Sequence, residues 1–135
     1  MKKNQNHRRP KPPSRDFLRQ ITTLLLDSEN KQQFLKRAGN ILTDCFHSQR
    51  WSIMLKTDPD KICICLAKGI HENIISQTII RCGEGIAGKI FLEGKGGLFV
   101  DIVHDLGMTS GGRYKSTSAI CVPISYQGEV LGLIN

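Results

Sequence analysis

The sequence contains no apolar run approaching the roughly 18 residues that a membrane-spanning helix needs. Its basic N-terminus leads into proline and polar residues rather than into the apolar core of a signal peptide. These two absences indicate a cytoplasmic protein without a membrane span. With 39% hydrophobic and 23% charged residues, the 135-residue chain has a globular composition, and its length fits one domain with a buried core.

The sequence also lacks the cysteine patterns of a disulfide framework or a zinc site. Its five cysteines are an odd number in mostly apolar surroundings, which indicates reduced, buried thiols. Cys63 and Cys65 lie two residues apart, but no Cys-x-x-Cys motif or histidine pair completes a tetrahedral metal site. Neither Cys45 nor Cys82 has the neighbouring base and orienting group that a nucleophile needs. We therefore expect no metal site and no catalytic residue.

Acidic residues are missing from the first 15 positions, where six lysines and arginines supply +6 of the total charge of +7. Residues 16–135 carry nearly balanced charge, so the basicity belongs to a tail. Residues 1–14 have no apolar side chain after Met1, and we expect them to form a disordered basic leader that does not bind nucleic acid. The alternative is a leader that binds nucleic acid or anionic lipid, with the folded part as its anchor.

Two amphipathic helices are predicted after this leader. Apolar residues recur at spacings of three and four over residues 17–25, with Ser14 as a candidate N-cap. A second apolar stripe runs over residues 34–46, in a helix that opens at Ser28 or Asn30.

From Trp51 the hydrophobic period changes to two, which predicts a strand that ends at the turn Asp58-Pro59-Asp60. The return strand over residues 61–68 is apolar on both faces. Its bulky side chains are expected on one face and its small ones on the other: Ile62, Ile64 and Leu66 against Cys63, Cys65 and Ala67. We expect helices on the bulky face and either packing or a ligand cavity on the small face.

The rest of the chain alternates short helices and strands. The predicted elements are a helix over 71–77, a strand near 78–81, a helix over 86–92, a strand over 98–101, and a hairpin of residues 118–125 and 129–134 joined by Tyr126-Gln127-Gly128. Before the second of these helices, Gly83-Glu84-Gly85-Ile86-Ala87-Gly88 has the spacing of a dinucleotide-binding loop. The preceding strand is short and no suitable βαβ unit follows, so we interpret these glycines as permitting a tight turn and close helix packing.

Three sequence stretches occur in an order that is specific to one family. They are Trp51-Ser52-Ile53-Met54-Leu55, the glycine segment 83–88, and the segment 113–118 that leads into Cys121-Val122-Pro123-Ile124 and Gly132-Leu133-Ile134-Asn135. Together they resemble a GAF domain, the small-molecule sensor module of cyclic-nucleotide phosphodiesterases, phytochromes, sensor kinases and transcriptional activators. The resemblance implies an α+β fold for residues 15–135, with an antiparallel six-stranded sheet, helices packed on one face and a ligand pocket on the other. It also implies that the chain lacks the C-terminal helix of such a domain.

The resemblance further implies a regulatory domain that is not an enzyme. It would sense an unidentified small molecule, form a homodimer through its N-terminal helices, and act on an output domain beyond Asn135 in signal transduction. Cyclic-nucleotide-binding members match here at Ser52, Ile86 and Ser116, but Lys68 replaces their usual acid and argues against a cyclic nucleotide. The sequence does not identify a cofactor. The expected ligand-binding residues are Ser52, Cys63, Cys65, Ile86, Asp101, Tyr114 and Ser116.

Free methionine sulfoxide reductase, an enzyme with a GAF-like fold, is the alternative. Its cysteines lie in the glycine loop and in the Asp-rich segment, whereas residues 85–88 and 101–105 of this chain contain none. We therefore expect no catalysis. Because the final helix of a GAF domain is missing, we also expect Leu24, Phe34 and Ile41 to be under-covered and the fold to be marginally stable unless a dimer covers them.

Overall fold

The computed structural model describes residues 14–99 and 118–135. The elements are α1 (Arg15–Asp27), α2 (Lys31–Phe46), β1 (Trp51–Asp58), β2 (Lys61–Lys68), α3 (Glu72–Gln77), β3 (Ile79–Arg81), α4 (Gly85–Glu93), β4 (Gly97–Phe99), β5 (Ala119–Tyr126) and β6 (Glu129–Ile134). This is the predicted order of elements. The strand predicted over 98–101 begins at Gly97, and its positions 100 and 101 lie outside the described residues. In the described ranges, no helix has the length and apolar character needed to cross a membrane.

Both N-terminal helices begin at a predicted cap. The Ser14 hydroxyl accepts a hydrogen bond from the Phe17 backbone N–H at 3.1 Å. The Asn30 side chain accepts one from the Gln33 backbone N–H at 2.9 Å, so Asn30 rather than Ser28 starts α2. Each cap satisfies an N–H group that the helix itself cannot pair, and such caps stabilise a helix by about 1 kcal/mol.

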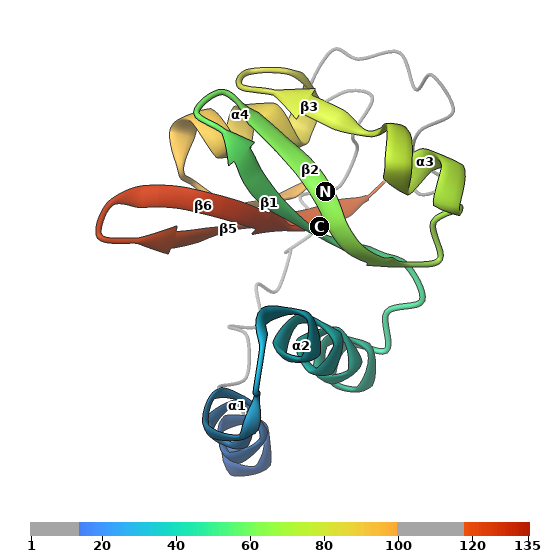
Figure 1. The fold of residues 1–135 in the computed structure, drawn as a ribbon, viewed down its shortest axis with the longest axis vertical. Helices are drawn as coiled ribbons and strands as arrows, with labels where there is room; N and C mark the ends of the chain where they lie inside the picture. The colour runs from blue at the N-terminus through green and yellow to red at the C-terminus, as the bar shows by residue number, and fades with distance from the viewer. Residues whose placement is uncertain (1–13, 100–117) are drawn as a thin grey trace, which may run out of the picture.

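The six strands form one antiparallel sheet in the order β3-β2-β1-β6-β5-β4 (Figure 1). Strands β5 and β6 are joined by Gln127 and Gly128, whose φ angles of 50° and 83° are both positive. Positive φ at both central positions is typical of the two-residue turns that match the twist of a hairpin. The predicted hairpin is confirmed.

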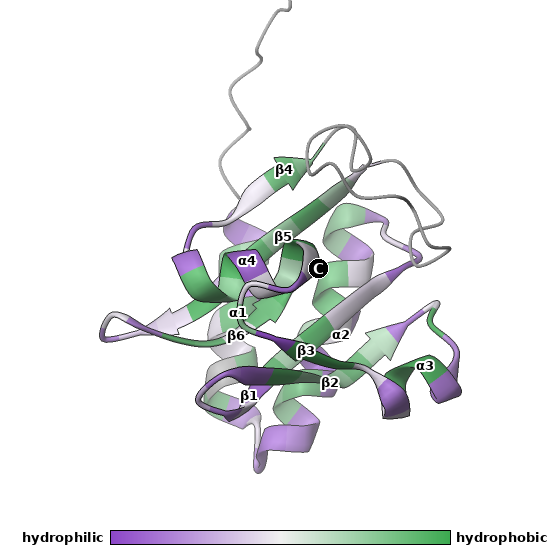
Figure 2. Cartoon of the chain, turned by 90° about the horizontal axis from the view of Figure 1, so that it is seen from above, coloured by the Kyte–Doolittle hydropathy of each residue, from purple (hydrophilic) through white to green (hydrophobic). Residues whose placement is uncertain are grey.

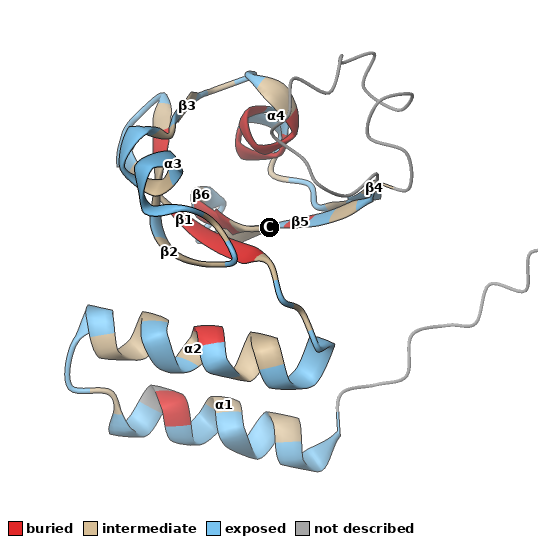
Figure 3. Cartoon of the chain, turned by 90° about the vertical axis from the view of Figure 1, so that its right-hand side faces the viewer, coloured by how far each residue is buried: buried red, intermediate tan, exposed pale blue. Residues whose placement is uncertain are grey.

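The helices lie on both sides of the sheet (Figure 3). Helix α2 faces one side and α1 packs against α2, farther from the strands, while α4 lies on the opposite side. We call the side toward α4 the inner face and the side toward α2 the outer face. The main core is on the inner face and consists of Met54, Ile62, Ile86, Ala87, Ile90, Phe91, Cys121 and Leu133.

The predicted facing of β2 is wrong in part, because a bulge interrupts its pairing with β1. Ile53 pairs with Leu66, but the next residue, Met54, pairs with Ile64, so Cys65 is an extra residue on β2. The bulge changes the alternation within the strand. Ile62 and Ile64 share the inner face and are covered by α4, as the prediction of a helix on their face requires, but the bulge places Leu66 opposite Ile53 on the outer face and Ala67 opposite Ser52 on the inner face.

The expectation about uncovered helix surface is also wrong in part. Leu24 is only 4% exposed, because it lies between α1 and α2. Phe34 and Ile41 are half-buried.

Trp51 joins α2 to the outer face of the sheet. Its indole N–H donates to the Thr43 hydroxyl at 2.9 Å, and its ring lies against Gly39. A Cβ atom at position 39 would overlap the ring. Glycine therefore sets the distance between helix and strand, although glycine inside a helix costs about 1 kcal/mol relative to alanine.

We expect Gly39→Ala to destabilise the protein by about 1–3 kcal/mol, because the clash with the indole outweighs the gain in helix propensity. Urea denaturation followed by tryptophan fluorescence measures the change. Asn40→Ala, on the exposed neighbouring position of α2, is the control and should change stability by less than about 0.5 kcal/mol. An unchanged or raised midpoint for Gly39→Ala would contradict this account.

Candidate functional site

Two of the predicted ligand-binding residues lie on the inner side of the sheet. Ser52 is on β1, two residues before the core residue Met54, and it is the buried polar residue of the described ranges, 5% exposed. Ile86 is in the first turn of α4 and packs in the core that contains Met54. Across from Ser52, β2 presents Ala67. Both side chains of this pair are small.

Asn135 was not predicted as a site residue, although it lies opposite Ser52. The two residues exchange both backbone hydrogen bonds, at 2.9 and 3.0 Å. The Asn135 side-chain amide N–H groups lie 3.4 Å from the Ser52 hydroxyl oxygen and 3.3 Å from the Met54 sulfur. The sequence signal for this position is a polar residue directly after the apolar strand β6. That signal identifies a site residue only when the pairing of Asn135 with Ser52 is known.

Cys63 and Cys65 do not join Ser52. The Cys63 sulfur lies 3.7 Å from the Thr57 hydroxyl, and Cys63 pairs with Leu55, so it is on the outer face. Cys65 is the exposed residue of the bulge, and its thiol is directed at the Cys63 carbonyl at 3.8 Å. Cys63 is therefore on the face opposite Ser52, and the Cys65 thiol is directed at its own strand rather than at Ser52. The remaining three predicted residues, Asp101, Tyr114 and Ser116, lie outside the described residues.

The glycine segment forms the turn between β3 and α4. The Glu84 N–H donates to the Arg81 carbonyl at 3.0 Å and the Gly83 N–H to the Gly88 carbonyl at 2.8 Å, so neither is available to a phosphate. Gly83 and Gly85 have φ angles of 83° and 61°, and a Cβ at Gly88 would overlap the Arg81 carbonyl. These contacts agree with a tight turn and close packing rather than with a dinucleotide site.

All five cysteines are free thiols, as expected, but only Cys121 is buried. Desolvation in the inner core raises the pKa of the Cys121 thiol from 9.0 to about 11. Cys45 and Cys65 are exposed, and Cys63 and Cys82 are half-buried, so the prediction of uniformly buried thiols is wrong. Within residues 14–99 and 118–135, no three His, Cys, Asp or Glu side chains come together as a metal site.

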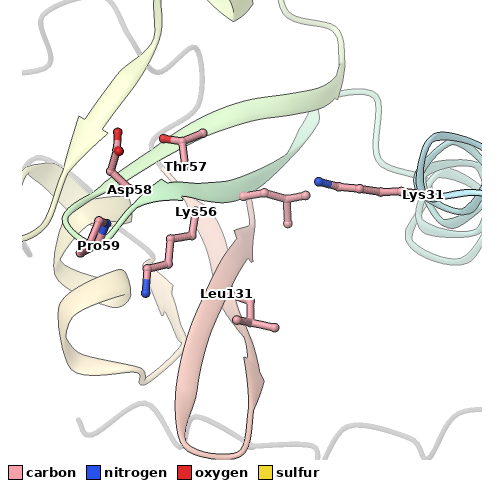
Figure 4. A pocket seen from close by; sticks show the side chains of 7 residues that line it. Lys31, Lys56, Thr57, Asp58, Pro59 and Leu131 are labelled. Carbon is pink, nitrogen blue, oxygen red and sulfur yellow. The ribbon is translucent and has the colours of Figure 1, made fainter.

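Two shallow hollows lie on the outer side of the molecule. The first, of about 490 Å³, lies between the start of α2 and the sheet and is lined by Lys31, Leu55, Lys56, Thr57, Asp58, Pro59 and Leu131 (Figure 4). Lys56 is paired with Glu129 there. The second, of about 510 Å³, lies between α1 and α2 and has a mostly polar and charged lining. Both are open to solvent and neither contains a predicted site residue, so they are weak candidates for a small-molecule site.

Comparison with protein-family models finds no match, and comparison with curated proteins finds none either. Among solved structures, the chain is similar to the GAF domain of a phosphoenolpyruvate-protein phosphotransferase (ptsP) from Coxiella burnetii, with a TM-score of 0.77 and 21% identity over 88% of this chain and 73% of that chain. It is also similar to the nlh2 GAF domain of A. aeolicus in an inactive state, with a TM-score of 0.72 and 22% identity over 88% and 75% of the two chains.

The chain has the GAF fold. The predicted α+β architecture with its antiparallel six-stranded sheet is thereby confirmed.

The same fold occurs in an enzyme. The free methionine-R-sulfoxide reductase of Neisseria meningitidis, solved in complex with its substrate, has a TM-score of 0.71 and 21% identity over 89% of this chain and 70% of that chain. The GAF fold alone therefore leaves catalysis undecided.

The buried Cys121 thiol predicts a pH dependence of stability. Its folded pKa of about 11 lies above the unfolded value of 9.0, so its stabilising contribution is complete below pH 9 and is lost as the pH rises to about 11. At about 1.4 kcal/mol per pKa unit, we expect a loss of roughly 2 kcal/mol over this window.

Denaturation of the wild type and of Cys121→Ala between pH 8.5 and about 11 measures this loss. The difference in unfolding free energy between the two proteins should shrink by roughly that amount across the window. Cys45→Ala removes an exposed thiol and should retain the wild-type slope. Equal slopes for the wild type and Cys121→Ala would show that Cys121 does not cause the effect.

Proposed function

We propose that the chain is a regulatory domain that senses a small molecule on the inner face of its sheet, beside Ser52 and Asn135. The main observation in support of this proposal is the contact between Ser52 and Asn135, which we call the polar pair. A hydroxyl and an amide meet on a face whose other core residues are apolar, with the hydroxyl almost fully buried. Ligand sites are typically apolar surfaces with a few convergent polar groups of this kind.

The position of the pair supports the same proposal. Helix α4 packs over Met54 and Leu133, while Ser52 and Asn135 lie two residues farther along β1 and β6, about 7 Å from these core residues. The Asn135 N–H groups are directed at Ser52 and Met54, which leaves the amide oxygen as an acceptor for a ligand. We include Asp101, Tyr114 and Ser116 in the proposed site as predicted from sequence, together with Ile86.

The relatives provide additional support. The Neisseria reductase was solved with its substrate, so at least one protein of this fold holds a small molecule. We propose that this chain uses its site to change a homodimer and an attached output domain, in the cytoplasm. The basis for that last step is the resemblance to GAF sensor modules.

The reductase is the second candidate function, favoured by its similarity in fold. The positions of the cysteines in this chain argue against the reductase. The glycine loop contains none, Cys82 before it is half-buried against the core, and Cys121 is a buried thiol with a raised pKa. A catalytic cysteine reacts as an accessible thiolate.

Native mass spectrometry of the purified chain tests the sensor proposal. We expect a small-molecule adduct on the wild type and an adduct reduced about tenfold or more on Ser52→Ala, because the ligand loses a buried hydrogen bond and Asn135 loses its partner. Thr57→Ala removes a hydroxyl from the outer face of the same strand and should keep the adduct. Equal adducts on Ser52→Ala and the wild type would exclude this site.

Incubation with free methionine-R-sulfoxide and dithiothreitol tests the enzyme candidate. We expect no methionine above the background of the thiol alone, because the glycine loop contains no cysteine and Cys121 is buried. The product is measured by amino-acid analysis. Turnover that disappears in Cys82→Ser would replace the sensor proposal with the reductase, whereas turnover retained in Cys82→Ser would point to a different cysteine.

A further inference from the structure

Cys63 and Cys65 are two accessible thiols on one strand, and the proposed sensor site gives them no role. They are separated by a single residue of β2, with Cys65 exposed and Cys63 half-buried. Strand β2 is hydrophobic along most of its length (Figure 2). Two thiols so close together in an apolar strand are the groups on this part of the sheet that can bind a soft ligand.

The bulge in β2 directs the Cys65 thiol back toward Cys63. Cys65 is the residue that the pairing with β1 skips, and in the described sheet β3 pairs with β2 only as far as Cys63. Bulges commonly re-aim a side chain, and here the Cys65 sulfur lies 3.8 Å from the Cys63 carbonyl oxygen. The Cys63 sulfur contacts the Thr57 hydroxyl at 3.7 Å. Because thiols are weak hydrogen-bonding groups, Cys63 can exchange this contact for a ligand shared with Cys65.

The spacing of the two cysteines favours a shared ion over a disulfide. Residues two apart in a strand are separated by about 6.6 Å, whereas a disulfide needs Cβ atoms about 3.8 Å apart. An ion held by two metal–sulfur bonds of about 2.3 Å each leaves the two sulfurs as much as about 4.6 Å apart. The bridge through an ion is therefore longer, and it fits a pair of strand residues with less distortion of the backbone.

The number of available ligands selects the ion. Zinc takes four ligands, and the described residues bring no three His, Cys, Asp or Glu side chains together. The expectation of no metal site rests on these missing ligands, but a linear ion needs only two. Thiolates select the soft ion Cu(I), which accepts linear coordination by two sulfurs. Strand β2 also contains two lysines and no acid, so its charge favours the net negative complex of Cu(I) with two thiolates.

We propose that Cys63 and Cys65 together bind one Cu(I) ion as a two-coordinate dithiolate site. On binding, two S–H bonds break, two Cu–S bonds form and both protons pass to solvent. Copper stays Cu(I), so the step needs no oxidant or reductant. Because protons compete with the metal for the two sulfurs, binding strengthens as the pH rises. The inference goes beyond the sensor proposal and does not rest on it, since Cys63 is on the face opposite Ser52.

Anaerobic competition between the purified chain and the Cu(I) indicator bicinchoninate tests the site. We expect the wild type to withdraw one Cu(I) per chain from the indicator. Cys63→Ser and Cys65→Ser should each weaken binding about a hundredfold or more, because serine replaces a soft thiolate with a hard hydroxyl. Cys45→Ser removes an exposed thiol of α2 and should retain the wild-type affinity. Circular dichroism checks folding. If a serine variant unfolds, protection of Cys63 and Cys65 from iodoacetamide by one equivalent of Cu(I) in the wild type tests the same pair.

Three results would overturn the copper site. The first is a wild type that withdraws no Cu(I), and the second is an unchanged affinity in Cys63→Ser or in Cys65→Ser. The third is one ion per two chains in native mass spectrometry, which would indicate a bridge between the exposed thiols of two copies. Ser52→Ala should lose the small-molecule adduct and keep the Cu(I) ion, so either proposal can fail without the other.

Discussion

Burial of β1 on both faces is the constraint on which the rest of the structure depends. The strand pairs with β2 on one side and with β6 on the other, and its first four residues are all buried. Toward α2, Trp51 packs against the only glycine of that helix, and toward α4, Met54 enters the core. A slip of one residue would exchange these two faces, so it is strongly disfavoured. One strand thus fixes both the register of the sheet and the positions of the helices.

Most of the fold could be predicted because the local signals agree with the tertiary contacts. Ser14 and Asn30 cap the helices whose apolar stripes follow them, and the change to period two at Trp51 coincides with the first strand. The glycine segment could also be interpreted correctly, since a short preceding strand and the missing βαβ unit exclude a dinucleotide loop. Where composition, periodicity and caps point to one structure, a single sequence is sufficient.

The site was harder to predict, because its residues are brought together by the pairing of strands rather than by their closeness in sequence. Cys63 and Cys65 were expected beside Ser52 on the assumption of unbroken alternation, but the bulge at Cys65 changes the facing within β2. A bulge adds one residue to one strand and leaves little trace in the hydrophobic pattern. Asn135 was missed for a related reason. It is 83 residues from Ser52 in sequence, and only the β1–β6 pairing places the two side chains together.

The same pairing places neighbouring residues at the end of β6 in different surroundings. Ile134 pairs with Ile53 on β1 and with Val122 on β5, whereas Asn135, the next residue, lies on the inner face beside Ser52. Because the side-chain period of a strand is two, a shift of one residue in this pairing would put an apolar side chain next to Ser52 in place of the amide. The register that β1 imposes on β6 is therefore also what places the polar pair of the proposed site.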